Sequence, residues 1–135
     1  MEQLTDRNSP EFFATENESY YFDRKSARKD AREIARHISA FANAAGGKLV
    51  IGIEDDGEIT GFKRDKARNI DEFRQAAILD CIPSPQIALA ELPVINSKGE
   101  DDFVLVMNIS ASPDRVIRRR SDNAVFLRQN DHSPD

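Results

Sequence analysis

The sequence predicts an α+β domain in which a mixed, largely antiparallel sheet of about six strands packs with two main helices. Residues 48–53 and 103–109 are short, nearly continuous apolar runs, which is typical of central strands covered on both faces. Residues 27–45 repeat apolar side chains at three- and four-residue spacings, which is the period of an amphipathic helix. Further short β-prone runs lie between turns rich in glycine, proline and aspartate.

In the first half of the chain, each element is bounded by local signals. The aromatic run at 20–22 favours a short strand. The helix at 27–45 is expected to stop at Gly46-Gly47, because glycine accepts a positive φ without steric cost. The tight-turn sequence at 55–57 (DDG) then predicts a hairpin whose return strand is 58–62.

In the second half, Asn69 or Asp71 can cap a second helix that reaches Cys81. Residues 87–95 predict a strand, and Pro93 within it predicts an edge position or a bulge, because proline lacks the N–H that a ladder requires. The remaining short strands are expected at 116–117 and 124–127, around a charged turn at 118–123.

The length of 135 residues is that of one domain. It divides into an acidic, loosely ordered segment at 1–17, a body at 18–130 and a tail at 131–135. No apolar run approaches the roughly 20 residues that cross a bilayer, so no membrane partner is expected. The start resembles neither a signal nor a transit peptide, and the single Cys81 fits a reducing compartment, so a cytoplasmic location is expected.

The net charge of −5 argues at first against a nucleic-acid partner, but the charge is unevenly distributed. Residues 1–23 carry six acids and one base, whereas residues 24–128 carry 18 bases and 16 acids. The body of the domain is therefore mildly basic. Partners are better inferred from its charged patches than from the total.

A basic face on the first predicted helix is the main candidate binding feature. At about 100° per residue, one side of this helix collects five cations, opposite its apolar stripe. They are Lys25, Arg28, Lys29, Arg32 and Arg36. A second contact region is Arg118, Arg119 and Arg120. Such groups neutralise phosphates, although a solvated helix surface with i,i+4 pairs would have the same pattern.

Aromatic side chains offer a second kind of contact. Tyr20, Tyr21 and Phe126 would stack on bases if they were exposed, but aromatic residues in short strands more often pack in a core.

Four carboxylates offer an enzymatic alternative. Glu18 and Asp23 flank the first strand, and Glu54 and Asp55 follow the central one. Acids that converge at strand ends can hold Mg²⁺ or Mn²⁺ for phosphodiester cleavage. Ordinary turn chemistry accounts equally well for the acids near Gly57. The chain has no zinc-type spacing and no phosphate-binding glycine loop, so no cofactor is expected outside this alternative.

Several short segments occur in an order that resembles the Schlafen AlbA-type domain. They are 22–27 (FDRKSA), 40–47 (AFANAAGG), 49–57 (LVIGIEDDG), 59–62 (ITGF) and the closing 125–128 (VFLR). The resemblance spans about residues 18–130. It is specific because the segments occur together, not because of any one of them.

The resemblance implies an α+β fold and a DNA-binding role, typically in transcriptional regulators where a regulatory or ATPase-like region often follows. Some relatives are endoribonucleases with three acids, to which Glu18, Asp23 and Asp55 (or Glu54) correspond by position. Asp23 stands here where the family signature has glutamate. Asn43 is expected to hydrogen-bond the turn that follows its helix.

The sequence therefore favours a nucleic-acid-binding module, with DNA expected as its ligand ahead of RNA. Two alternatives stay open. One is the metal-dependent nuclease, and the other is a protein-interaction domain, in which exposed sheet edges pair to form a homodimer.

Overall fold

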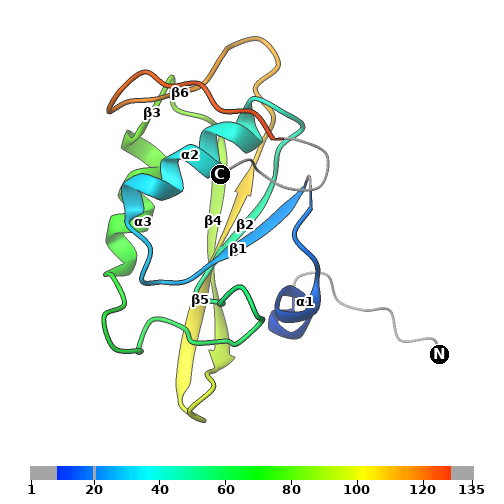
Figure 1. Cartoon of the computed structure of the whole chain (residues 1–135), viewed down its shortest axis with the longest axis vertical. Helices are drawn as coiled ribbons and strands as arrows, with labels where there is room; N and C mark the ends of the chain where they lie inside the picture. The colour runs from blue at the N-terminus through cyan, green and yellow to red at the C-terminus, as the bar shows by residue number, and fades with distance from the viewer. Residues whose placement is uncertain (1–8, 20, 129–135) are drawn as a thin grey trace, which may run out of the picture.

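The chain folds around a mixed four-stranded sheet (Figure 1). A computed structural model describes residues 9–19 and 21–128. The elements in chain order are α1 Pro10–Thr15, β1 Phe22–Lys25, α2 Ala31–Ala42, β2 Gly47–Ile51, α3 Ile70–Leu79, β3 Cys81–Ile82, β4 Ile87–Ile95, β5 Asp101–Ile109 and β6 Arg118–Arg119. This confirms the α+β class, with three helices where two main ones were predicted.

The sheet order is β1-β2-β5-β4, and a separate two-stranded sheet pairs β3 with β6. β1 and β2 run parallel because α2 carries the chain back across the sheet between them. β5 pairs antiparallel with both β2 and β4. The sheet is therefore mixed, and the prediction that it would be largely antiparallel was wrong.

The two predicted central strands are confirmed. Leu49, Val50 and Ile51 of β2 are fully buried, so both faces of that strand are covered. β5 lies between β2 and β4. β4 is an edge strand, as Pro93 predicted, and Pro93 keeps regular register opposite Phe103 without a bulge.

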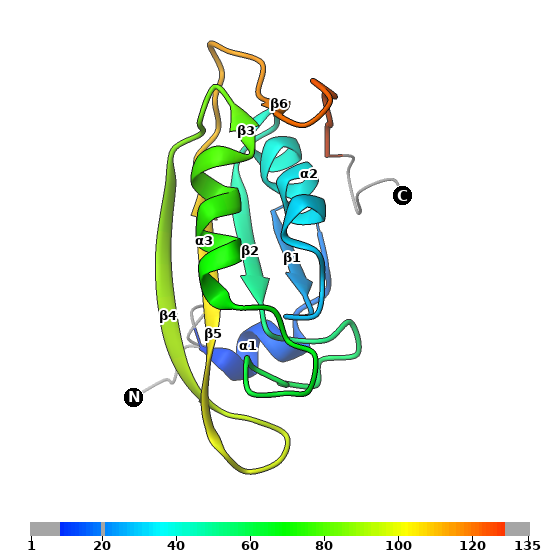
Figure 2. The same ribbon diagram turned by 90° about the vertical axis from the view of Figure 1, so that its left-hand side faces the viewer.

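Helices cover both faces of the sheet. α2 and α3 lie on one face (Figure 2), where Ile34, Phe41 and Phe73 pack with strand residues such as Met107 in the larger core. α1 lies on the opposite face, where the Phe13 ring stacks on that of Phe22 with centroids 5.8 Å apart. No helix within residues 9–19 and 21–128 has both the length and the apolar character to cross a membrane.

The N-terminal segment predicted to be loosely ordered contains α1. Ser9 caps this helix by accepting the Phe12 N–H at 3.1 Å, and Phe13 anchors it in the smaller core. Residues 1–8 and the predicted tail at 131–135 lie outside the described residues.

The first long helix is shorter than its pattern predicted. The Asp30 side chain accepts the Arg32 N–H at 2.9 Å and caps α2 at Ala31, so residues 27–29 form a turn. The helix ends at Ala42, three residues before the predicted end. The first strand begins at Phe22 and extends to Lys25, whereas it was predicted at 20–22; Tyr20 is outside the described residues.

The hairpin predicted around the turn at 55–57 has almost no return strand. Within 58–62, only Ile59 pairs with Ile53, in a single bridge. The chain turns away there because the Asp102 carboxylate accepts the N–H groups of Phe62 and Lys63.

Near the C-terminal end, Arg118 and Arg119 form strand β6, although they were predicted in a turn. Val125 pairs with Arg118 in a single bridge, whereas strands had been expected at 116–117 and 124–127. The second long helix is capped by Asn69, one of the two residues predicted for this position. It ends at Leu79, and Cys81 begins β3.

Candidate nucleic-acid interface

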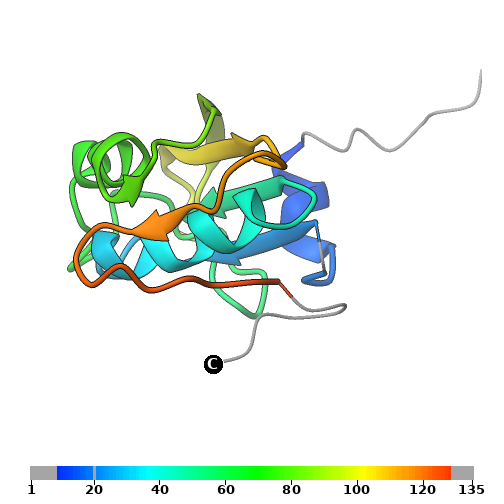
Figure 3. The same cartoon turned by 90° about the horizontal axis from the view of Figure 1, so that it is seen from above.

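Arginines from α2 and from the segment around β6 line one small pocket of about 110 Å³. Its lining residues, which we call the arginine pocket, are Arg32, Ala35, Asp80, Arg119, Arg120 and Ser121. Figure 3 shows why they meet: orange β6 and the segment that follows it run alongside the cyan helix α2. Two basic groups more than eighty positions apart in the sequence thus share one surface.

Main-chain contacts hold the arginine segment in place. The Arg120 N–H donates to the Asp80 carbonyl at 2.7 Å, and Arg120 Nε donates to the Leu79 carbonyl at 2.6 Å. Cys81 and Arg119 are paired across the β3–β6 ladder. The end of α3 therefore holds Arg120 in the lining of the pocket.

Phe126 packs between two arginines. The Arg119 guanidinium lies 4.9 Å and the Arg36 guanidinium 5.8 Å from the centre of its ring. Cation–π contacts of this kind orient the guanidinium groups. They also occupy the ring, so Phe126 is not an open platform for a base.

Asn43 holds the C-terminal segments against α2. Its Nδ2 donates to the carbonyls of Ile117 at 2.8 Å and Phe126 at 3.0 Å, and its Oδ1 accepts the Ile117 N–H at 2.7 Å. The prediction that Asn43 would bond the turn after its helix was wrong. The side chain instead bridges two segments distant in sequence, which no local pattern indicates.

The other cations predicted to share a helix face do not. Arg28 and Lys29 lie in the turn before α2, and Arg28 Nε donates to the Asp65 carbonyl at 2.8 Å. Lys25 ends β1 and pairs with Asp23 at 3.5 Å. Arg118 is exposed outside the arginine pocket. The helix starts too late to carry Lys25, Arg28 or Lys29.

Carboxylates partly neutralise the positive charge of the arginine pocket. Arg119 makes two hydrogen bonds to Asp122, at 3.1 and 2.6 Å, and these raise the pKa of Arg119. Arg32 lies 3.7 Å from Asp30. Burial raises the pKa of Asp80 above its ordinary value. Within the described part of the chain Arg120 makes no salt bridge, although its charge and that of Arg32 favour the ionised form of Asp80 in the same pocket.

A second charged cluster lies beside β1 and centres on Asp23, which is 3% exposed. Its Oδ2 lies 3.5 Å from Lys25, 3.4 Å from Arg128 and 3.6 Å from His37 Nδ1. Arg128 also donates to the Ser19 carbonyl and covers the Phe41 ring at 4.2 Å. The Asp23 cluster therefore joins β1, α2 and the C-terminal segment.

The pKa values in the Asp23 cluster diverge. Burial, a hydrogen bond with Asp23 and the charge of Asp23 raise the pKa of Glu18 to about 7. Burial opposes ionisation of Asp23, but the Glu18 hydrogen bond and the Lys25 charge together hold its pKa below the usual range. Burial, with the charge of Lys25, lowers the pKa of His37 to about 4. At neutral pH, Asp23 is thus ionised and His37 is neutral, whereas Glu18 is divided between its protonated and ionised forms.

The predicted metal ligands do not form a set that fits a divalent cation. Glu54 Oε2 bonds Arg64 at 2.7 Å and Thr60 at 2.6 Å, apart from the Glu18–Asp23 pair. Asp55 affects the pKa of Glu18 only as its weakest contributor. Among the residues that the structure describes, no three His, Cys, Asp or Glu side chains are placed to hold a metal ion. Asp23 Oδ2 is already paired with Lys25 and Arg128, and its Oδ1 accepts the Arg24 N–H at 2.8 Å.

Glu18 and His37 should give opposite pH dependences of stability. The raised pKa of Glu18 stabilises the fold below pH 4.5, and this contribution is lost as the pH rises through 7. The lowered pKa of His37 stabilises the fold above pH 6.5, and this contribution is lost as the pH falls through 4.

The two effects therefore offset each other in the wild type between pH 4.5 and 6.5. In Glu18→Gln we expect the free energy of unfolding to rise with pH across this window by about 1 kcal/mol more than in the wild type. Urea denaturation at several pH values measures the difference, with exposed Glu11→Gln as the matched control. Parallel wild-type and Glu18→Gln profiles would contradict the assignment.

Several site residues were not predicted. Asp80, Ala35 and Ser121 line the arginine pocket, and Arg128 is a buried partner of Asp23. A local signal exists only for Arg128, which closes the 125–128 segment of the family resemblance. The pocket residues come together through the β3–β6 pairing, which two-residue strands do not reveal in a sequence.

The sequence matches the family model described as Schlafen, AlbA_2 over residues 18–134. That span includes both the arginine pocket and the Asp23 cluster. No curated protein matches the chain.

A solved structure has a similar fold. The crystal structure of the DIP2311 protein from Corynebacterium diphtheriae has a TM-score of 0.55 and 22% sequence identity, over 82% of this chain. The similarity shows a shared fold. The chain corresponds to 21% of that protein's length.

Proposed function

Because the chain belongs to the Schlafen AlbA_2 family, which is associated with nucleic acids in general, we propose that it is a nucleic-acid-binding module whose arginine pocket contacts phosphates. The ligand we propose is DNA in preference to RNA, and the biological setting is a transcriptional regulator. Both follow from the family resemblance.

The observation that carries the proposal is the convergence of Arg32 from α2 with Arg119 and Arg120 beside β6. Arginine presents a planar fork of donors that matches phosphate oxygens. Arg119 is tied to Asp122 by short hydrogen bonds and to Phe126, whereas Arg32 makes only an exposed, longer contact with Asp30 and Arg120 makes no salt bridge among the described residues. Arg32 and Arg120 are therefore the residues whose charges a phosphate would meet. Contacts of this kind position a nucleic acid without reading its sequence.

The test is the double variant Arg32→Ala/Arg120→Ala, measured by fluorescence anisotropy of labelled duplex DNA at several salt concentrations. Wild-type affinity should fall steeply with salt, because bound phosphates release counterions. Losing two phosphate contacts should weaken binding about tenfold or more near physiological salt and reduce the slope of log K against log salt by about 2.

The matched control is Arg68→Ala/Arg115→Ala, which removes the same charge from exposed positions outside the arginine pocket. It should change affinity by less than about threefold, which reflects only the change in overall charge. Equal losses in the two double variants would argue that net charge, not the pocket, governs binding. No binding by the wild type would exclude the proposal and favour a protein partner.

A further inference from the structure

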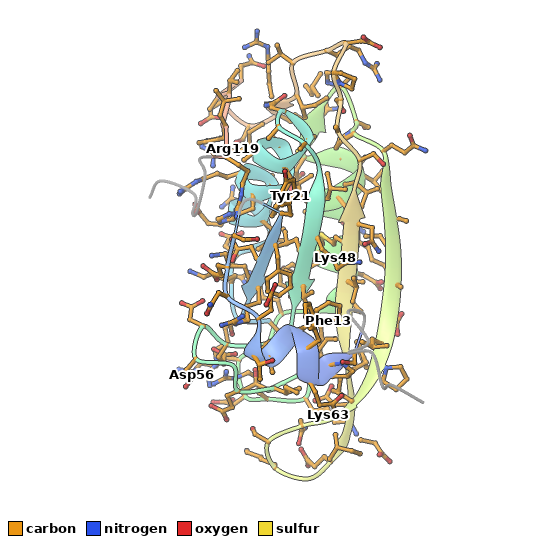
Figure 4. All side chains as sticks on the ribbon, turned by 90° about the vertical axis from the view of Figure 1, so that its right-hand side faces the viewer. Phe13, Tyr21, Lys48, Asp56, Lys63 and Arg119 are labelled. Atoms are coloured by element: carbon orange, nitrogen blue, oxygen red, sulfur yellow. The ribbon has the colours of Figure 1, made fainter. Side chains whose placement is uncertain are left out.

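The face of the sheet that carries α1 is open at one end. Figure 4 looks onto this face: α1, with Phe13, crosses one part of it, and Tyr21 and Lys48 lie beyond the helix. A shallow hollow of about 430 Å³ occupies the open part. We call it the sheet-face hollow, and the residues that line it include Tyr21, Lys48, Gln86, Ala88, Asn108 and Ser110.

The strand register builds this hollow. Lys48 of β2 is opposite Asn108 of β5, and Asn108 is opposite Ala88 of β4, so the three side chains form a row across the sheet. The methyl group of Ala88 leaves space beside Asn108. Val50 and Val106 are the next residues on this face of β2 and β5, two positions from Lys48 and Asn108, and they belong to the core beneath α1. The same face therefore changes from apolar to polar where α1 ends.

The hollow combines three kinds of chemical group. The Tyr21 side chain is 60% exposed at its rim, which is uncommon for an aromatic residue beside a sheet. Lys48 Nζ donates to Asn108 Oδ1 at 2.8 Å, so this amide has a fixed orientation. The amides of Gln86 and Asn108 each carry both donors and acceptors. A flat aromatic ligand with a polar edge and an adjacent anion matches this combination.

We propose that the sheet-face hollow binds one unpaired base of a single-stranded nucleic acid. The base stacks on Tyr21, its polar edge meets the amides of Asn108 and Gln86, and Lys48 contacts the neighbouring phosphate. Base–aromatic stacking of this kind tolerates any sequence. A paired base within a duplex cannot present its face to Tyr21, so the hollow distinguishes single strands from duplexes.

This inference rests on the proposed function only in taking a nucleic acid as the ligand. The hollow and the arginine pocket lie on opposite faces of the sheet, because α2 covers the face that α1 does not. Substitutions in one site are therefore separable from those in the other.

Intrinsic fluorescence tests the stacking directly. The chain has two tyrosines and no tryptophan, so a Tyr20→Phe variant leaves Tyr21 as its only tyrosine emitter. Titration with a short oligothymidine should quench this emission, whereas a duplex of the same length should not. Absence of quenching at concentrations where anisotropy shows the single strand bound would overturn the proposal.

Affinity gives a second readout. Tyr21→Ala should weaken binding of the labelled oligothymidine about tenfold, which is within the range for one stacked base, and should leave duplex binding unchanged. Tyr21→Phe keeps the ring and should bind like the wild type. Circular dichroism confirms that each variant is folded.

The failures are distinguishable. If Tyr21→Ala binds the single strand as the wild type does, while Arg32→Ala/Arg120→Ala loses duplex binding, only the sheet-face hollow is excluded. If the wild type binds neither ligand, both proposals fail. If light scattering shows a dimer that Tyr21→Ala dissociates, the hollow is a contact between two copies of the chain and the base-binding proposal is overturned.

Discussion

Replacing Asp23 with alanine is expected to lower the free energy of unfolding by about 4 kcal/mol, as is typical when one member of a buried ion pair is removed. Asp23 is nearly fully buried, and Lys25 and Arg128 lie within 3.5 Å of its Oδ2. Without the carboxylate, the buried Arg128 guanidinium loses its ion pair with Asp23. Urea denaturation at pH 7 measures the loss.

The matched control is Asp114→Ala, which removes an exposed carboxylate and should change stability by less than about 0.5 kcal/mol. In the double variant Asp23→Ala/Arg128→Met, the buried charge that has lost its ion pair is also removed, so the double variant should be more stable than Asp23→Ala alone. Additive losses from Asp23→Ala and Arg128→Met would contradict a direct charge interaction between the two side chains.

The Asn43→Ala variant is expected to lose about 3 kcal/mol of stability, because three hydrogen bonds to main-chain groups of Ile117 and Phe126 are broken at once. The alanine fits the local backbone, whose φ of −76° and ψ of −9° are helical. The loss therefore reports the hydrogen bonds and not backbone strain. Thermal and urea denaturation measure it.

Asn43→Asp tests which bonds matter. The carboxylate still accepts the Ile117 N–H but offers no donor to the carbonyls of Ile117 and Phe126. Asn43→Asp should therefore lower stability at least as much as the loss of these two hydrogen bonds. Gln75→Ala removes an exposed amide from α3 and should be nearly neutral. A loss in Asn43→Ala no larger than that in Gln75→Ala would show that the C-terminal segment is held without Asn43.

Asn43 also connects stability to the candidate interface. Its bonds fix Phe126, and the Phe126 ring orients Arg36 and Arg119. We therefore expect Asn43→Ala, at temperatures where it remains folded, to weaken duplex DNA binding as well. A variant that is less stable but binds normally would separate the arginine pocket from this tether.

Local patterns were sufficient to predict elements whose burial follows directly from composition. The apolar run at 48–53 contains the buried central strand β2. Pro93 lies on the edge strand β4, because a proline has no N–H to donate to a strand on each side. Asn69 caps α3 as its side chain predicted. Each of these features depends on residues close in sequence or on the composition of a single strand, so a local pattern can reveal it.

The start of α2 was mispredicted because periodicity does not show where a helix begins. Residues 27–29 continue the helical spacing, yet the Asp30 side chain caps the helix at Ala31. That one shift removed Arg28 and Lys29 from the helix. Because Lys25 lies in β1, the predicted basic face is divided between three places.

Composition, apolar periodicity and the ordered family segments determined the fold class, the central strands, the edge strand and the family. Tertiary structure alone decided which charges meet. Arg32 reaches Arg119 and Arg120 because β6 pairs with a two-residue strand after α3. Asp23 reaches Arg128, 105 positions away, because the C-terminal segment packs across α2. The physical reason is that the partners of a charged side chain depend on how segments distant in the sequence pack together.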